Sequence, residues 1–90
     1  MKITFDPAKR EKTQLERGMD FNDAAEVMEG VTFRWIDDRF EYGETRVVTI
    51  GRLRGRMVVL VWTQRGEARH IISMRKANDR EQAKYRKYLD

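Results

Sequence analysis

The sequence predicts an α+β domain in which a curved antiparallel sheet is combined with two N-terminal helices and one C-terminal helix. The apolar residues follow a helical period between Pro7 and Gly30 and a strand-like pattern after it. Three of the later β-rich runs are separated only by short polar turns. The predicted order is β-α-α-β-β-β-β-α. Because no linker or repeat interrupts residues 1–90, we expect a single domain.

The first helix has signals at both of its ends. Asp6 is suited to accept hydrogen bonds from free backbone N–H groups, and Pro7 fits the first helical position. Gly18 is suited to the left-handed conformation that ends a helix. The apolar stripe of this helix is thin and consists of Ala8 and Leu15, so we expect most of the helix to contact solvent.

Two further helices are predicted, one before the main strands and one after them. Asp20 caps the earlier helix and Gly30 ends it. The last helix covers about residues 79–89, where Asn78 as N-cap and Glu81 three residues later form a capping-box pattern. The residues of the earlier helix that we expect to face the core are Phe21, Ala24, Ala25, Val27 and Met28.

Five extended runs are predicted to build the sheet. Residues 57–62 are apolar throughout, which indicates a central strand covered on both faces. Short turns at 54–56 and 64–67 indicate that the last three strands are antiparallel neighbours. An acidic loop covers residues 37–44. The runs are residues 2–5 as a short edge strand, 31–36, 45–53, 57–63 and 68–75.

Charge is distributed unevenly along the chain, whose net charge is +4. Residues 1–45 hold 7 Lys or Arg and 11 Asp or Glu, whereas residues 46–90 hold 12 and 4. The arginines of the second half lie on predicted strands rather than on a loose tail. We therefore expect this half to face a polyanion and the acidic half to suit a basic partner. Solubility alone is the alternative explanation.

The motifs of several protein classes are absent from this chain. The absence of cysteine excludes disulfides and thiolate metal sites, and one histidine does not make a zinc site. Phosphate-binding and nucleophile-elbow motifs are also absent, so we expect neither a metal nor another cofactor. No apolar run approaches the roughly 18 residues of a membrane span, and no signal peptide is recognised. We expect a cytoplasmic protein with no membrane partner.

Short motifs along most of the chain resemble one family. The most specific is Ile-Ile-Ser-Met-Arg-Lys-Ala at residues 71–77, followed by Phe-Asp-Pro-Ala-Lys at residues 5–9. The other motifs are Phe21 with Ala24–Val27, Glu44–Arg46 leading to Ile50–Gly51, and Arg80–Glu81 with Tyr85. In order and spacing, these segments resemble the BrnT toxin family.

The resemblance implies a RelE-like fold, ribonuclease activity and growth arrest. It also implies neutralisation by a BrnA-type antitoxin, through which the complex binds operator DNA. Two positions depart from the family pattern. Members often carry His-Gly where this chain has Arg17-Gly18, and arginine where it has His70. Basic character is kept at both positions, but the group that transfers the proton need not be the same.

Metal-free RNA cleavage needs a base for the 2′-hydroxyl, an acid for the leaving 5′-oxygen, and cations for the charged transition state. Arginine suits the last role because its planar fork binds two phosphate oxygens. Side-chain alternation predicts that Arg46 and Arg52 share one face of their strand and that Arg69 and Arg75 share one face of theirs. We expect these side chains to meet in one groove, where Arg52 and Arg69 contact RNA.

Three cations are candidates for the catalytic site. Arg75 is the predicted phosphate clamp, and its alternative is a salt bridge to Glu44 or Glu81. Lys76 is a candidate for a second phosphate contact, or for a base if burial lowers its pKa. The alternative is a solvated lysine that precedes the last helix. Arg46 is expected to reach the same site, with a cross-strand ion pair as the alternative.

Proton transfer and RNA contacts have their own candidates. His70 has a side chain that titrates near neutrality, although a structural role is the alternative. Glu44 is a candidate base unless it is a solvated loop carboxylate. Tyr85 resembles the tyrosine with which RelE-like toxins stack on a base or orient the nucleophile, and packing on the sheet is its alternative. Lys9 and Lys12 extend the predicted RNA contacts along the first helix.

Three functions are therefore in competition. The leading hypothesis is a metal-independent endoribonuclease toxin that an antitoxin inhibits. A non-catalytic RNA- or ribosome-binding module explains the charge without a proton-transfer pair. A toxin that acts on a protein target is the third hypothesis.

Overall fold

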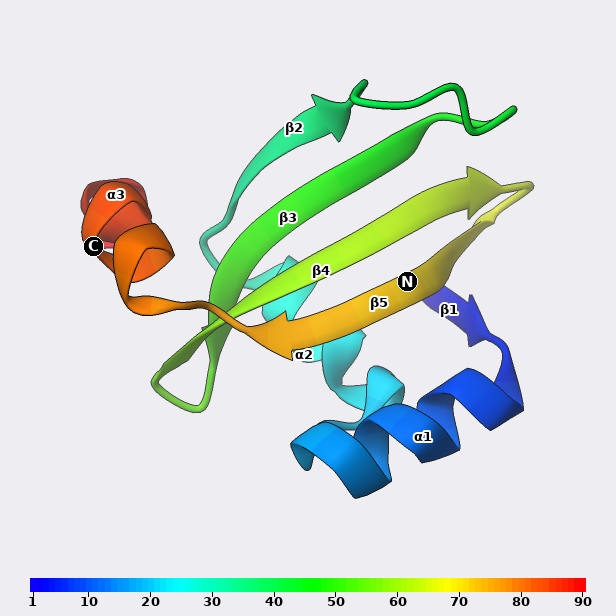
Figure 1. Ribbon diagram of the computed structural model, residues 1–90, viewed down its shortest axis with the longest axis horizontal. Helices are drawn as coiled ribbons and strands as arrows, with labels where there is room; N and C mark the ends of the chain where they lie inside the picture. Colours follow the sequence, from blue (N-terminus) through cyan, green and yellow to red (C-terminus); the bar gives the residue numbers. More distant parts are fainter.

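The computed structural model describes residues 1–90 and has the predicted order of elements (Figure 1). One 3₁₀ turn, Phe21–Asp23, directly precedes the second helix. None of the helices combines the length and the apolar composition needed to cross a bilayer. The helices are α1 (Pro7–Arg17), α2 (Ala24–Glu29) and α3 (Asp79–Leu89), and the strands are β1 (Lys2–Phe5), β2 (Phe33–Asp37), β3 (Arg46–Leu53), β4 (Arg56–Arg65) and β5 (Ala68–Lys76).

The five strands form one mixed sheet in the order β1-β5-β4-β3-β2, with the apolar strand β4 at its centre as predicted. Strands β2 to β5 are antiparallel neighbours. β1 instead runs parallel to β5, with Lys2 opposite Ala68 and Phe5 opposite Ile71. The prediction of an antiparallel sheet is therefore wrong for β1. No tight turn fixes the direction of β1, because the rest of the chain lies between it and β5.

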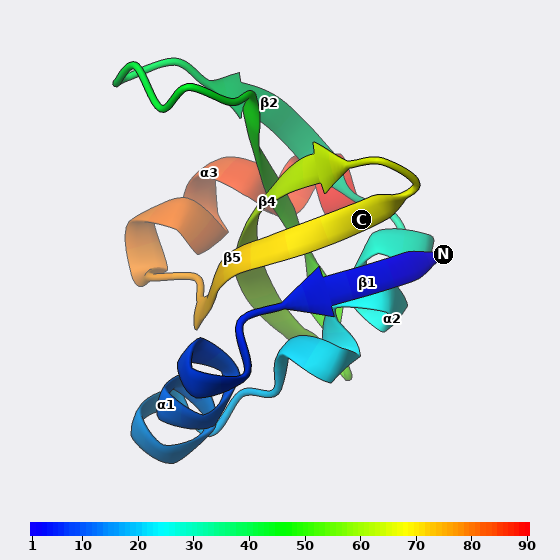
Figure 2. The same ribbon diagram turned by 90° about the vertical axis from the view of Figure 1, so that its right-hand side faces the viewer.

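Helices cover the two faces of the sheet differently. α2 lies on one side of the sheet and α3 on the other (Figure 2). Phe21 and Val27 are fully buried on the α2 side, where they pack with Leu60. On the α3 side, Leu89 packs with Ile50. α3 contacts only part of this face, chiefly β2 and β3, so the remaining part is open to solvent.

A β-bulge interrupts β5 near its middle. Val61 of β4 pairs with Ser73, whereas the next residue, Trp62, pairs with Ile71. Ile72 is therefore the extra residue and has no partner on β4. Side chains of β5 alternate normally before and after Ile72. Because of the extra residue, odd-numbered side chains point to one face before it and to the opposite face after it.

The bulge corrects the predicted arrangement of the basic side chains on β5. Ile71 and Met74 are three residues apart, yet both are buried in the core on the α2 side. Arg69 lies on that side and Arg75 lies on the α3 side, so the prediction that they share a face is wrong. Lys76 follows Arg75 in alternation, which places it on the α2 side as an exposed residue.

Polar contacts, rather than an apolar face, hold α1 against the rest of the molecule. None of its residues is buried, and Leu15 is 79% exposed, so the predicted apolar stripe does not pack. Arg10 donates two hydrogen bonds to Asp20, of 2.9 and 2.7 Å. Arg17 Nη1 donates to the carbonyl oxygen of Met74 at 3.1 Å, which ties the end of α1 to β5.

Gly51 allows β3 to pass close to α2. A Cβ atom at this buried position would lie 2.7 Å from Val27 Cγ1 and 3.1 Å from Thr32 Cγ2. We expect Gly51→Ala to lower the free energy of unfolding by about 1–3 kcal/mol through overpacking, as measured by urea denaturation. Gly30→Ala is the matched control, because its nearest atom would be 3.6 Å away. Unchanged stability of the Gly51 variant would contradict the close approach.

Candidate active site

A groove of about 450 Å³ lies on the α3 side of the sheet, beyond the part that α3 covers. Its floor is formed by valines of β3 and β4, and its walls by the loop after β2 and by the start of α3. The groove is therefore open along the sheet and partly apolar at its base. Its lining residues are Trp35, Ile36, Asp37, Asp38, Arg39, Val48, Val59, Val61, Ser73, Arg75 and Glu81.

The pairing of the strands brings three of the predicted site residues to this face. Arg46 on β3 lies opposite Thr63 on β4, which in turn lies opposite His70 on β5. Because neighbouring strands are about 4.8 Å apart, the Cα atoms of Arg46 and His70 are separated by about 10 Å. Arg75 lies farther along β5, opposite Val59, at the α3 end of the groove.

Arg46 has an incompletely satisfied guanidinium group. Its Nε atom is buried and has no hydrogen-bond partner. The nearest carboxylate oxygen, Glu44 Oε1, is 3.6 Å from Nε, and the guanidinium lies over the Tyr42 ring at 4.0 Å from the ring centre. The ring and the Glu44 carboxylate therefore position the guanidinium, while its buried Nε donor remains without a hydrogen bond.

Arg75 is held in a bidentate ion pair, as its alternative interpretation predicted. Its Nη1 and Nη2 atoms donate to the two Glu81 oxygens at 2.7 and 2.8 Å. Glu81 also accepts from the backbone N–H of Asn78 in the capping box of α3. These hydrogen bonds, with that from Arg75 the largest, lower the pKa of Glu81. The pair fixes Arg75 at the groove, but a phosphate would have to share it with Glu81.

His70 and Glu44 lie near each other at the other end of this face. Nδ1 of His70 is 2.9 Å from Thr4 Oγ1 on β1. Burial, followed by the charge of Arg65, lowers the pKa of His70 below 6.5, and the charge of Glu44 opposes this shift. His70 is therefore mainly neutral at pH 7. Glu44 is half-buried and forms ion pairs with Arg46 at 3.6 Å and Arg65 at 3.4 Å.

Tyr85 belongs to an aromatic cluster between α3 and the edge of the sheet. Its ring stacks on Trp35 with centres 5.2 Å apart and planes inclined by 15°, and it also packs against Phe33. Packing on the sheet, the alternative role for Tyr85, is therefore present. Trp35 connects this cluster to the groove, since it lines the groove wall.

The other predicted cations do not meet in the groove. Arg69 lies over the Trp62 ring on the α2 side, at 4.5 Å from the ring centre. Arg52 is paired with Asp90 at 2.6 Å, beside the end of α3. The expectation that all four strand arginines meet in one groove is wrong. Only Arg75 lines the groove, and Arg46 lies on the same face of the sheet outside that lining. The bulge in β5 and the end of α3 direct the other two elsewhere. Lys9 and Lys12 line a separate cleft beside α1.

A buried carboxylate that the sequence did not predict holds the loop between β2 and β3. Asp37 is only 7% exposed and accepts hydrogen bonds from Nε and Nη2 of Arg39 at 2.9 and 3.0 Å. The Tyr42 hydroxyl also donates to Asp37 at 3.2 Å. This contact places Tyr42 under Arg46. The sequence shows only an acidic loop here, because the fold alone decides which of its carboxylates is buried.

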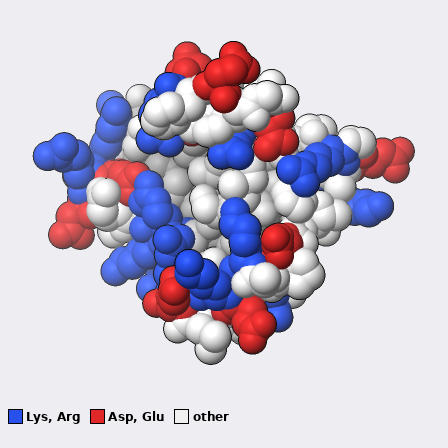
Figure 3. All heavy atoms as spheres, turned by 45° about the vertical axis from the view of Figure 1, so that its right-hand side comes forward, with Lys and Arg blue, Asp and Glu red and all other residues white.

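Lys and Arg side chains form a band across the lower half of the molecule, with acidic groups mainly around its margins (Figure 3). α1 occupies the lower part of the molecule in Figures 1 and 2, so this band covers its neighbourhood. The cationic surface is therefore wider than the groove alone. The structure has no group of three or more His, Cys, Asp or Glu side chains placed to hold a metal ion.

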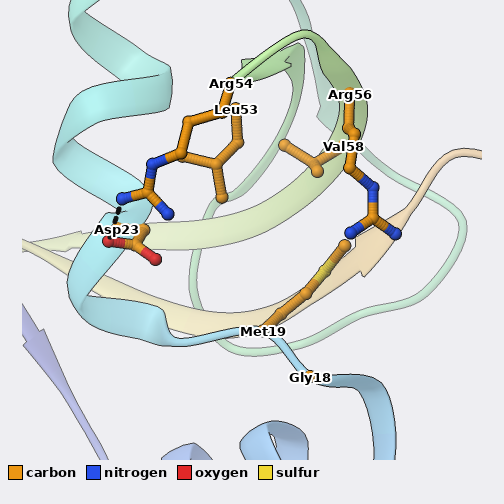
Figure 4. A pocket seen from close by; sticks show the side chains of 7 residues that line it. All are labelled: Gly18, Met19, Asp23, Leu53, Arg54, Arg56 and Val58. Atoms are coloured by element: carbon orange, nitrogen blue, oxygen red, sulfur yellow. Dashed lines mark hydrogen bonds and ion pairs between the residues drawn. The ribbon is translucent and has the colours of Figure 1, made fainter.

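A smaller hollow of about 130 Å³ lies at the opposite end of the sheet, between the β3–β4 turn and the segment that follows α1. Arg54 points to Asp23 there and donates to it at 3.2 Å, while Arg56 points toward Met19 (Figure 4). Because Arg54 is paired and the hollow is small, we assign the functional site to the groove.

Together, the fold and the site define a small basic α+β protein with an arginine-bearing groove open to a polyanion. A family model described as the ribonuclease toxin BrnT of type II toxin–antitoxin systems matches residues 5–81. The chain therefore belongs to the BrnT toxin family, as the sequence motifs predicted. It is a ribonuclease toxin, which implies an RNA target and an antitoxin partner. Comparison with curated proteins gave no match.

The ion pair between Asp37 and Arg39 predicts that the conformation of the loop between β2 and β3 depends on pH. Hydrogen bonds from Arg39, chiefly from its side chain, lower the pKa of Asp37 to about 2. A carboxylate with a lowered pKa stabilises the fastened loop above about pH 4, and this stabilisation is lost as the pH falls toward 2. We expect the NMR signal of the Arg39 Nε–H group to keep its folded position down to pH 4 and to shift below it.

The matched variants for this prediction are Asp37→Asn and Asp38→Asn. In Asp37→Asn, the Arg39 Nε–H signal should already be shifted from its folded position at pH 7, because the amide of asparagine carries no negative charge to bind Arg39. Asp38 is exposed and forms no ion pair, so its variant should follow the parent. A parental signal in Asp37→Asn at pH 7 would show that the loop is held by other contacts.

Proposed function

We propose that this chain is a metal-independent endoribonuclease with a RelE-like fold, and that its groove binds the scissile phosphate of RNA. The observation that carries the proposal is the guanidinium of Arg46, whose buried Nε lacks a hydrogen-bond partner on an open face of the sheet. Leaving such a donor unsatisfied is unfavourable, and an anionic phosphate oxygen is the acceptor that an arginine binds most strongly.

The reaction is an internal transfer within the RNA. The 2′-oxygen forms a bond to the adjacent phosphorus while the bond from phosphorus to the 5′-oxygen breaks. A base receives the proton of the 2′-hydroxyl, and an acid donates a proton to the leaving 5′-oxygen. The products are a 2′,3′-cyclic phosphate and a free 5′-hydroxyl. Arg46 and Arg75 stabilise the charge that develops on the phosphate oxygens.

His70 receives the proton in this proposal, since its lowered pKa keeps the imidazole neutral at pH 7. Glu44 is the alternative base, because it lies beside Arg46 on the same face. Tyr85, stacked on Trp35 at the groove wall, contributes an aromatic surface beside the substrate base. Lys76 lies on the other face, so the proposed catalytic set does not include it.

The ion pair between Arg75 and Glu81 favours a second candidate function. If Glu81 keeps Arg75 occupied at 2.7 Å, the groove binds RNA through Arg46 and the lysines of α1 without accelerating its cleavage. Such a module would show salt-dependent RNA affinity and leave the RNA intact.

The partner proposed for this chain is a BrnA-type antitoxin that occupies or distorts the groove. The support is the family, since its type II systems pair a toxin with an antitoxin. The toxin then reaches operator DNA only through the antitoxin, and the free toxin arrests growth in the cytoplasm. Co-expression of the antitoxin should restore growth.

Cleavage of RNA in the presence of EDTA tests the proposed reaction. We expect the parent protein to cleave, and Arg46→Ala to lower kcat/KM by about 10²–10³-fold, because one charged donor to the transition state is lost. Arg46→Lys should recover part of this loss. Arg54→Ala is the control, since Arg54 is an exposed arginine at the opposite end of the sheet. All variants should have the parental melting temperature.

Two outcomes would count against the proposed reaction. Intact RNA after incubation with folded parent protein would favour the binding module. Cleavage that persists unchanged in both Arg46→Ala and Arg75→Ala would show that neither guanidinium acts on the scissile phosphate.

The proposed role of His70 predicts the pH dependence of cleavage. The neutral imidazole is the active form, and its pKa in the free protein is below 6.5. We therefore expect kcat/KM to fall only when the pH drops below this lowered value. His70→Gln should remove that acid limb, whereas Glu44→Gln should only shift it, because the Glu44 charge raises the pKa of His70. An acid limb that survives in His70→Gln would assign the base to another group.

A further inference from the structure

The second half of β5 has a free edge beside α1. β1 pairs with β5 only over residues 68–71, so residues 72–76 have no neighbouring strand on that side. α1 follows β1 and runs past this free edge, to which Arg17 ties it. A cleft of about 280 Å³ separates the two elements and is lined chiefly by Lys9, Lys12, Thr13 and Ser73.

The cleft carries cations that the protein does not neutralise. Lys9 and Lys12 are exposed, lie one turn apart on α1, and have no carboxylate within ion-pair distance. Glu16 is the single acidic residue in the lining. Lysine is suited to phosphate as a point charge, without the fixed geometry that arginine requires.

The cleft and the groove meet at the β-bulge. Ser73 lines both of them, so the two hollows adjoin at this residue of β5. Ile72, the extra residue of the bulge, has no partner on β1 or β4. Lys9 also lies close enough to His70 to lower its pKa, which places the cleft near the groove cations.

We propose that the cleft between α1 and β5 is a subsite for the phosphate of the nucleotide that flanks the scissile linkage. This inference rests on the proposed ribonuclease function of the groove. A single RNA strand then crosses β5 at Ile72 and Ser73, with its scissile phosphate in the groove and a flanking phosphate near Lys9 and Lys12. The crossing suits an unpaired strand, since the edge of one β-strand separates the two hollows. An acidic peptide is less well matched, because Ile72 is the one apolar residue that lines the cleft.

A comparison of substrate lengths tests the subsite. The probes are a pool of dinucleotides, which contain only the scissile phosphate, and a single-stranded RNA of about a dozen nucleotides with free phosphates on both sides. We expect Lys9→Gln/Lys12→Gln to lower the ratio of kcat/KM for long RNA to kcat/KM for dinucleotides by about tenfold, since each lost phosphate contact weakens binding. Arg54→Gln/Arg56→Gln removes the same charge at the β3–β4 turn and should leave the ratio unchanged.

Equilibrium binding gives a readout that does not depend on cleavage. The probe is the same RNA with 2′-O-methyl groups, which has no attacking hydroxyl. Loss of the one phosphate bound in the cleft should reduce the slope of log K against log salt by about 0.7, the value for one phosphate of a single strand. This measurement tests the cleft even if the parent protein proves unable to cleave RNA, so the subsite and the proposed reaction fail separately.

Three results would overturn the subsite. The first is an unchanged salt slope in a lysine variant whose melting temperature is parental. The second is an equal loss of kcat/KM for dinucleotides and for long RNA, which would place the lysines at the scissile phosphate itself. The third is unchanged RNA binding combined with a weakened antitoxin complex, which would make the cleft a protein-docking surface.

Discussion

The extra residue at position 72 determines which side chains of β5 can reach the groove. With regular alternation, Arg69 and Arg75 would share a face, and the basic side chains of this strand would act together. The bulge instead separates them, so that Arg75 joins Arg46 while Arg69 covers Trp62 on the α2 side. The bulged residue also lies where β1 has ended, so that Ile72 and Ser73 line the cleft beside α1. One local change in strand pairing thus organises both cationic surfaces.

The arginines near the groove are all ion-paired, but they differ in how closely the carboxylate engages the guanidinium. Arg39 is bound to Asp37 and Arg75 to Glu81, each through two hydrogen bonds. These pairs fix the loop after β2 and the start of α3, which form the walls of the groove. Arg46 instead lies over the Tyr42 ring, and its ion pair with Glu44 is long, at 3.6 Å, and leaves the buried Nε without a hydrogen bond. The walls are therefore held by close ion pairs, whereas Arg46 is the least satisfied guanidinium on this face.

Local signals predicted the elements well, and long-range contacts account for the errors. Asp6, Gly18 and the Asn78 capping box act where the sequence places them, because each bonds to residues a few positions away. The parallel pairing of β1 with β5 has no such signal, since it joins the two ends of the chain. Among the site residues, Arg46, His70 and Arg75 share one face, although regular alternation along β5 predicts opposite faces for His70 and Arg75. The roles of Asp37 and Ser73 were not predicted, because both depend on packing between distant segments.

By itself, the sequence determined the type and order of the elements, the central position of β4, the cationic character of the second half, and membership of the BrnT family. These properties depend on residue type, on short-range periodicity and on motifs that remain readable without coordinates. Only the tertiary structure decided the direction of β1, the faces of β5 and the pairing state of each arginine. A single inserted residue reverses side-chain alternation, and an ion pair requires two groups from different elements to meet. Neither effect leaves a periodic trace in the sequence.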